Sequence, residues 1–387
     1  MQPDADLLVL GGGCAGLSLA QRLARAGARA PRALVLEQRT QYAEDRTWCF
    51  WDHGEPWSRL ASHHWDCVAV DVGRWDVAVD CSATPYRMVR ATDFYADAMG
   101  AMGGHVSLLQ GVSVSGQPRH VNGLWEVATG DGVLRAPHLL DTRPGPAPRR
   151  GGALLWQSFA GHEIECDAPV FDPRRATLMN FTSADERGAA FTYVLPVSRT
   201  RALVEATVFG PDPLGPPALS RALGTAIAAR TGAAGHQVLR TEAGVLPMGL
   251  PPAEPVGWAR AGVGAGAARP STGYAFNRIQ RWAEACAQSV LAGGPPLDTP
   301  ADAWRLRHMD RLMLHALRAR PGLAPRLFVS LFAHASTPRL LRFLSDRGSW
   351  LDCAAVAAAM PVRRFGGALL AAARPAAKAE NWPASAG

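Results

Sequence analysis

The feature that most constrains the fold is a glycine-rich turn near the start of the chain, between a short apolar run and a helix-forming segment. Residues 6–10 read Asp-Leu-Leu-Val-Leu, and Gly-Gly-Gly-Cys-Ala-Gly follows at 11–16. In a strand–turn–helix unit, Gly11 permits the tight turn, Gly13 leaves room for a pyrophosphate, and Gly16 lets the helix pack closely on the strand. The pattern predicts a dinucleotide site, with Cys14 and Ala15 at the helix start that faces the phosphates.

A second apolar run, residues 33–36, supports this prediction. It ends in Glu37, about 20 residues past the motif, where an acid can accept hydrogen bonds from ribose hydroxyls. These features indicate only that a dinucleotide binds. We expect FAD, by analogy with flavoproteins that open on such a fingerprint and carry their substrate domain later in the chain.

Composition narrows the class of protein. The 387 residues are 48% hydrophobic and 19% charged, which is typical of a folded globular protein, and no apolar span reaches the roughly 20 residues of a transmembrane helix. The net charge of +7 is spread without a block of like charges, so nucleic-acid binding is a poor interpretation. The charge favours a phosphate-bearing cofactor or an anionic membrane face, and does not separate the two.

The cysteines and the N-terminus predict the compartment. The seven cysteines are odd in number and far apart, so we expect reduced thiols in the cytoplasm and no metal site. No basic segment precedes the first apolar run, and residues 7–10 are interpreted as a buried strand, not as a signal peptide.

Residues 45–51 form an aromatic stretch, Asp-Arg-Thr-Trp-Cys-Phe-Trp, which we interpret as a loop. Trp48, Phe50 and Trp51 could form a wall beside the ligand and stabilise positive charge through their ring faces, or they could simply fill the core. Further on, Arg87 and Arg90 are candidate cofactor contacts, although exposed arginines are commonly just solvated.

A sheet is predicted after residue 157, with strands at 177–181, 190–196 and 201–209. Such an antiparallel sheet can form the back wall of a substrate cavity. Glu205 is the only acid of the last strand; burial would raise its pKa and make it a general acid. Alternation would equally allow it to face solvent.

A second glycine cluster at 261–266, followed by Arg-Pro-Ser-Thr-Gly-Tyr at 269–274, predicts a further approach to the cofactor. Its candidate contacts are Gly262, Pro270, Gly273 and Tyr274. The remainder of the chain is predicted to be helical. Its short apolar segments 351–360 and 365–373, separated by Arg363 and Arg364, could rest on a membrane or pack on the core.

The predicted fold is α/β: a Rossmann-type FAD-binding domain, an antiparallel-sheet substrate domain and a helical C-terminal region. We assign the discontinuous FAD-binding domain to 1–45, 85–150 and 240–300. The substrate domain takes 46–84 and 151–239, and the helical region takes 301–387.

Six segments of the chain together match a known family pattern: GGGCAGLSLA, DRTWCFW, PYRMVR, LVEATVF, PSTGYAF and RFLSD. With these segments the sequence resembles the bacterial lycopene beta-cyclases over nearly its whole length. The resemblance implies an FAD-dependent intramolecular lyase that converts the psi end groups of lycopene to beta rings by way of gamma-carotene, with reduced FAD and NAD(P)H as electron donor. It implies Glu205 as the acid/base and the aromatic stretch with Tyr193 as substrate contacts. Acids of the family pattern are replaced by Asn180 and Ala206, which weakens mechanisms that need paired carboxylates.

Two other readings remain open. A flavin-dependent monooxygenase or polyprenyl reductase of similar architecture would perform a redox reaction, and a carotenoid- or flavin-binding protein would perform none. The resemblance also leaves open a peripheral contact with the inner face of the cell membrane.

Overall fold

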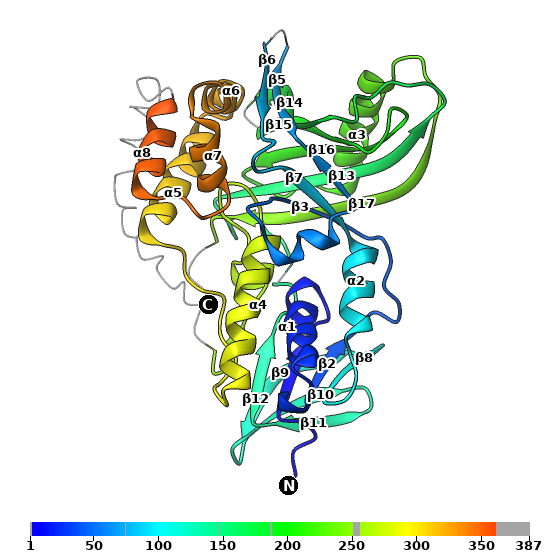
Figure 1. Cartoon of the computed structure of the whole chain (residues 1–387), viewed down its shortest axis with the longest axis vertical. Helices are drawn as coiled ribbons and strands as arrows, with labels where there is room; N and C mark the ends of the chain where they lie inside the picture. Colours follow the sequence, from blue (N-terminus) through cyan, green and yellow to red (C-terminus); the bar gives the residue numbers. More distant parts are fainter. Residues whose placement is uncertain (1, 74, 146, 186–187, 251–255, 361–387) are drawn as a thin grey trace, which may run out of the picture.

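The computed structural model describes residues 2–73, 75–145, 147–185, 188–250 and 256–360. One unit is built on a parallel five-stranded sheet in the order β18-β12-β1-β2-β8, whose edge strand β18 comes from the second half of the chain. Helix α1 packs between α2 and α4 beside this sheet (Figure 1). The elements are β1 (Leu7–Leu10), α1 (Cys14–Arg25), β2 (Ala33–Glu37), α2 (Ala91–Gly100), β8 (Val106–Gln110), β12 (His138–Asp141), β18 (Ala259–Arg260) and α4 (Phe276–Leu291).

The second large unit is a seven-stranded sheet in the order β17-β13-β16-β15-β14-β5-β6. Its pairs are antiparallel apart from the parallel pair of β14 and β5. This sheet confirms the three predicted strands. Its members are β5 (Cys67–Val72), β6 (Trp75–Asp80), β13 (Leu155–Cys166), β14 (Arg175–Asp185), β15 (Gly188–Pro196), β16 (Arg201–Gly210) and β17 (His236–Met248).

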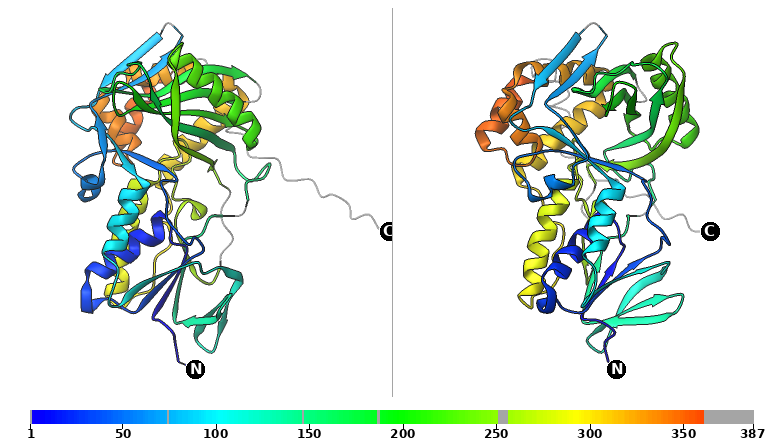
Figure 2. Two further views of the ribbon diagram at one scale, coloured as in Figure 1. Left: turned by 90° about the vertical axis from the view of Figure 1, so that its right-hand side faces the viewer. Right: turned by 45° about the vertical axis from the view of Figure 1, so that its right-hand side comes forward.

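The two faces of this sheet have different coverings because successive side chains of a strand alternate. Val204 and Ala206 pack under α3 (Pro216–Thr231) on one face. Leu203 and Phe209 lie on the other face, in the core shared with the C-terminal helices. Figure 2 shows α3 and the C-terminal helices on different sides of the sheet. Glu205 therefore points toward the helical region and away from α3.

The prediction of a loop at the aromatic stretch is wrong for residues 47–51, which form a strand. β3 (Thr47–Trp51) pairs with β7 (Tyr86–Arg90), which also pairs with β4 (His63–Trp65). The large aromatic side chains favour a pleated, half-buried surface, and pairing with β7 satisfies the backbone. Strand β17 spans the domain limit that we placed at residue 240. Strand β7 starts just after the limit at residue 85 and pairs with β3 and β4, which we assigned to the substrate domain.

The remaining elements are a small sheet and short helical turns. The order β11-β10-β9 extends the N-terminal unit. These elements are η1 (Gly27–Arg29), η2 (Pro56–Leu60), β9 (Val114–Val121), β10 (Leu124–Thr129), β11 (Gly132–Ala136), η3 (Val263–Ala265) and η4 (Pro321–Leu323).

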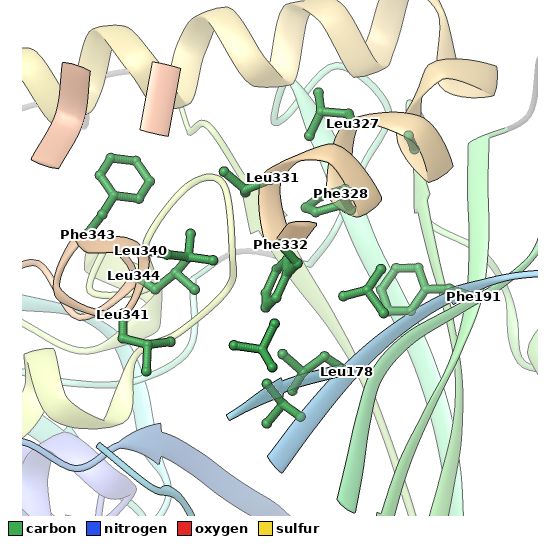
Figure 3. Packing of buried hydrophobic residues seen from close by; sticks show 14 of the residues in the cluster. Leu178, Phe191, Leu327, Phe328, Leu331, Phe332, Leu340, Leu341, Phe343 and Leu344 are labelled. Atoms are coloured by element: carbon green, nitrogen blue, oxygen red, sulfur yellow. The ribbon is translucent and has the colours of Figure 1, made fainter. Parts of the chain in front are cut away.

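The C-terminal region is helical, as predicted, up to the last described residue. Phe328 and Phe332 of α6 face Leu178 and Phe191 of the large sheet (Figure 3). The predicted segment 365–373, with Arg363 and Arg364, lies outside the described residues. None of the helices described is both long and apolar enough to cross a bilayer. The helices are α5 (Trp304–Ala319), α6 (Ala324–His334), α7 (Thr337–Leu344) and α8 (Trp350–Ala359).

A buried ion pair joins the second glycine segment to these helices. Arg269 Nη2 lies 3.2 Å from Asp310 Oδ1 on α5, and both side chains are almost completely buried. Ser271 Oγ donates to the same carboxylate at 2.7 Å, and the Arg269 guanidinium stacks over the ring of Phe343. The loop at 269–275 is therefore fixed by contacts with two helices, with Asp310 on α5 and with Phe343 on α7.

Replacing Asp310 by alanine is expected to lower the free energy of unfolding by about 3–5 kcal/mol, because the Arg269 charge would stay buried without its main partner. Urea unfolding followed by tryptophan fluorescence measures this loss. Asp131→Ala, in an exposed turn, is the control and should change stability by about 0.5 kcal/mol or less. A loss for Asp310→Ala as small as the control's would contradict the assignment.

Candidate functional site

One cavity of about 1360 Å³ connects the glycine turn to the large sheet and the C-terminal helices. One end is formed by the turn after β1 and the end of β2. The middle lies against β3, β13, β15, β16 and β17. The far end is apolar and is lined by Leu178, Met309, Met313, Phe328, Leu331, Phe332, Leu344 and Met360.

The glycine turn has the shape that the sequence predicts. A Cβ on Gly16 would lie 2.0 Å from the carbonyl oxygen of Gly11, so only glycine allows this helix–strand contact. A Cβ on Gly13 would meet no atom within 4 Å, because that position opens on the cavity. No described side chain caps α1, and its first amides, at Cys14 and Ala15, are next to the space that a pyrophosphate would need. The site fits a dinucleotide.

Glu37 lies at the end of β2 and lines the cavity, as predicted. Its Oε2 accepts a hydrogen bond from the Gly12 amide at 2.8 Å, and its Oε1 accepts one from Arg39 Nε at 3.1 Å. Burial alone would raise the pKa of Glu37, but the hydrogen bonds from Arg39 and Gly12 hold it below its usual range. Arg39, which sequence reasoning missed, therefore holds Glu37 in place and favours its ionised form.

The second glycine cluster approaches the first. A Cβ on Gly262 would lie 3.3 Å from the Cβ of Ala15. Gly262, Gly273 and Tyr274 line the cavity, whereas Pro270 is not among its lining residues. The structure thus joins two segments about 250 residues apart into one site.

The two candidate arginines have other partners. Arg87 forms an ion pair with Asp52, and Arg90 with Glu163. Neither is among the described residues that line the cavity. Their position on β7 directs both side chains into these local ion pairs.

The aromatic candidates separate by position. Trp48 and Tyr193 line the cavity. Phe50 stacks on Phe276 in a buried cluster, and Trp51 packs against Tyr86 in the main core. Neither Phe50 nor Trp51 is among the lining residues, so the structure places them behind the cavity wall.

Three buried tyrosine hydroxyls meet beside this wall. Tyr86 Oη lies 2.9 Å from Tyr193 Oη and 3.1 Å from Tyr274 Oη. Burial raises the pKa of all three phenols. The cluster is therefore neutral and supplies hydrogen bonds without charge.

Glu205 lies in a cross-strand row on the cavity side of the large sheet. It is opposite Tyr193 on β15 and opposite Gly161 on β13. Its side chain is 8% exposed, and its Oε1 accepts a hydrogen bond from Thr207 Oγ1 at 2.6 Å. The alternation that the sequence left open is thus resolved: Glu205 faces the cavity.

The same row contains a second acid, Glu242, which sequence reasoning missed. Gly161 pairs with Glu205 on one side and with Glu242 of β17 on the other. Glu242 Oε2 accepts hydrogen bonds from Arg240 Nη1 at 2.6 Å and from Thr47 Oγ1 at 2.9 Å. The sequence offers little signal for it, because Glu242 follows the polar pair Arg240-Thr241 in a segment that we had assigned to the cofactor domain.

Sequence comparison identifies the family. The family described as "Lycopene cyclase protein" matches residues 6–369. The chain belongs to this family. The lycopene beta-cyclase of Paracoccus sp. (strain N81106 / MBIC 01143) is 35% identical over 187 residues, which is 46% of this chain and 47% of that protein. The lycopene beta-cyclase of Pantoea ananas is 28% identical, over 71% of this chain and 72% of that protein. The lycopene beta-cyclase of Pseudescherichia vulneris is also 28% identical, over 79% of each protein.

Solved structures show the same fold at low identity. The flavin-dependent brominase Bmp2 superposes with a TM-score of 0.60 at 14% identity, covering 94% of this chain and 99% of that one. A geranylgeranyl bacteriochlorophyll reductase-like protein from Thermoplasma acidophilum gives 0.58 at 14% identity, with the same coverage. The fold of this lycopene cyclase family member is therefore that of FAD-dependent enzymes.

The acids of the family pattern that are missing here do not belong to the Glu205 row. Ala206 packs under α3, on the face opposite the cavity. Asn180 pairs with Thr192, which pairs with Ala206, so both positions share the neighbouring row. The two acids that share a row in this family member are Glu205 and Glu242.

The surroundings of the two carboxyl groups favour different charge states. Burial, followed by the negative charge of Glu242, raises the pKa of Glu205 to about 8, with the Thr207 hydrogen bond opposing it. Burial also raises the pKa of Glu242, but Arg240 and Thr47 stabilise its anion. At neutral pH we assign the proton to Glu205 and the charge to Glu242.

This charge state predicts the pH dependence of any reaction in which Glu205 gives a proton. A raised pKa keeps the acid protonated below about pH 8, so the rate should be nearly constant from about pH 6 to 7. Above the pKa it should fall about tenfold per pH unit, as the acid form is lost. A profile of kcat/KM against pH measures this, and an undiminished rate two units above pH 8 would contradict it.

Proposed function

We propose that this protein is a lycopene beta-cyclase, which converts the psi end groups of lycopene and other acyclic carotenoids to beta rings without net redox change. The observation that carries the proposal is a buried Glu205 on the wall of a cavity that continues from a dinucleotide site to an apolar far end. The named activity of the three relatives supports it.

Glu205 is the proton donor in this proposal. Its proton adds to C2 of the end group, the C5–C6 double bond attacks the resulting C1 cation, and loss of a proton from C6 completes the ring. Trp48 and Tyr193 line the cavity, where an aromatic ring can stabilise positive charge by about 0.5–2 kcal/mol. The apolar far end excludes water, which would otherwise capture the cation.

FAD is the proposed cofactor, held by Gly11, Gly13, Cys14, Ala15, Glu37, Gly262, Gly273 and Tyr274, with NAD(P)H as the proposed reductant. Gly16 does not line the cavity, and it lets α1 pack on the turn after β1. Reduced flavin, once bound, would supply negative charge that stabilises the developing cation. Since Pro270 does not line the cavity, its role would be to shape the loop.

The direct test is to incubate the purified protein with lycopene, FAD and NAD(P)H without oxygen, and to analyse the pigments by chromatography and mass spectrometry. Products with beta rings and the mass of lycopene are expected. A gain of oxygen or of hydrogen would favour a monooxygenase or polyprenyl reductase. Bound pigment without product would favour a carotenoid-binding protein.

We also propose peripheral contact with the cytoplasmic face of a membrane, where an apolar substrate would be dissolved. Trp304 and Trp350 are 69% and 70% exposed at the starts of α5 and α8. Arg305 Nη2 donates to the Gly348 carbonyl at 3.1 Å, which brings these helix starts together. Exposed tryptophans beside arginines favour the interface of an anionic bilayer.

The double substitution of Trp304 and Trp350 by serine is expected to weaken binding to vesicles that contain anionic lipid by roughly tenfold, through loss of interfacial apolar area. Co-sedimentation measures the bound fraction. Turnover of detergent-dispersed lycopene, the control, should stay unchanged. Unaltered vesicle binding would contradict the contact.

A further inference from the structure

Two carboxyl groups face each other across a residue without a side chain. The point where a Cβ of Gly161 would lie is 3.4 Å from Glu205 Cβ and 3.4 Å from Glu242 Cγ. Neighbouring strands are about 4.8 Å apart, so acids two strands apart are normally separated by the side chain between them. Gly161 removes that barrier, and both acids line the same cavity.

The hydrogen bonds leave one oxygen of each acid available. Glu242 accepts the hydrogen bonds from Arg240 and Thr47 on one oxygen, Oε2. Glu205 accepts the hydrogen bond from Thr207 on its Oε1. Glu242 Oε1 and Glu205 Oε2 receive no hydrogen bond from the part of the chain that the structure describes. Each is therefore free to exchange a proton with the other or with a ligand.

Arg240 connects Glu242 to a second buried acid. Its Nε donates to Glu163 Oε2 at 2.6 Å, and Glu163 also pairs with Arg90 and Arg201. The three arginines carry one more positive charge than the two negative charges that Glu163 and Glu242 carry when both are ionised. This network favours the anionic form of Glu242, whereas Thr207 is the one described hydrogen-bond partner of Glu205.

We propose that Glu242 is the base of the reaction: it accepts the C6 proton and returns it to Glu205 across Gly161. The inference rests on the proposed ring closure. The Glu205 O–H bond breaks as the C2–H bond forms, and the C5–C6 pair forms the C1–C6 bond. The C6–H pair then becomes the C5=C6 double bond while its proton binds Glu242 Oε1. Transfer from Glu242 to the Glu205 carboxylate restores both acids, with no net change in protons or electrons.

The role of Glu242 includes the choice of product. After ring closure the cation at C5 can lose a proton from C6, from C4 or from the methyl group on C5. A carboxylate fixed on β17 by Arg240 and Thr47 would select one of these hydrogens. Without it, the double bond would form at several positions in products of identical mass.

The test compares Glu242→Gln with wild type under reducing, oxygen-free conditions, with products separated by chromatography and their double bonds located by NMR. Ring closure should slow by ~10²-fold or more, and part of the product should carry a C4–C5 or exocyclic double bond. Glu165→Gln, on the same sheet but bonded to Thr200, is the control and should match wild type. Flavin binding and circular dichroism establish that each variant is folded.

Gly161→Ala tests the return step while retaining both acids, and covers the case in which Glu242→Gln fails to fold. Rapid-quench assays should show one fast ring closure per site and slower later ones. Glu242→Gln with wild-type rate and only beta rings, or Gly161→Ala with equally fast successive turnovers, would overturn the proposal. Absence of any cyclised product from wild type would instead overturn the proposed function itself.

Discussion

Glu205→Gln is expected to lower the rate of ring closure by ~10²–10⁴-fold, since the amide has nearly the same shape but cannot give the proton. Rates are measured with reduced FAD and lycopene at about pH 7, where the wild-type acid is protonated. The fold should persist because the glutamine can keep the hydrogen bond with Thr207. We expect unchanged flavin affinity, which separates a chemical defect from a binding defect.

Full activity of Glu205→Gln would remove Glu205 from the acid role and would leave ring closure without a proton donor among the residues proposed here. A loss of flavin binding in the same variant would indicate a structural role.

Gly16→Val is expected to abolish flavin binding and to lower the free energy of unfolding by about 3 kcal/mol. The added Cβ would lie 2.0 Å from the Gly11 carbonyl oxygen, and this neighbour is backbone that the parallel sheet fixes. Titration with FAD, followed by flavin fluorescence, and urea unfolding measure the two effects.

Gly13→Ala is the matched control, because its Cβ would meet no protein atom within 4 Å and its φ of −79° suits any residue. It should fold with near wild-type stability and still bind FAD more weakly, since its methyl group enters the space assigned to the pyrophosphate. Equal flavin affinity for Gly13→Ala and wild type would contradict that assignment.

The features that the sequence predicts well depend on local geometry. Gly11, Gly13 and Gly16 lie within one turn, so their roles follow from the strand–turn–helix pattern alone. Glu37 is predictable because a short βαβ unit fixes its distance from the turn. The strand that carries Glu205 is equally clear from its apolar residues.

The features that could not be predicted from the sequence depend on how distant strands pair in the sheet. Glu242 meets Glu205 only because β13 lies between β16 and β17 in the sheet. Trp48 lines the cavity, whereas Phe50 and Trp51 lie in buried clusters, and the assumption of a loop concealed this difference. Arg87 and Arg90 look like cofactor contacts in the sequence, yet nearby carboxylates on other segments bind them.

The row Tyr193–Glu205–Gly161–Glu242 also has a consequence for how the protein folds. Its members come from four strands, and β13 must pair with a strand about 80 residues later before the acids meet. Closing such long loops has an entropic cost and slows folding. The unit β1–α1–β2, whose members are neighbours in sequence, can form earlier. During refolding, protection of its backbone amides should therefore precede the recovery of catalysis. Flavin capture should come later than this protection, because it also needs Gly262 and Tyr274.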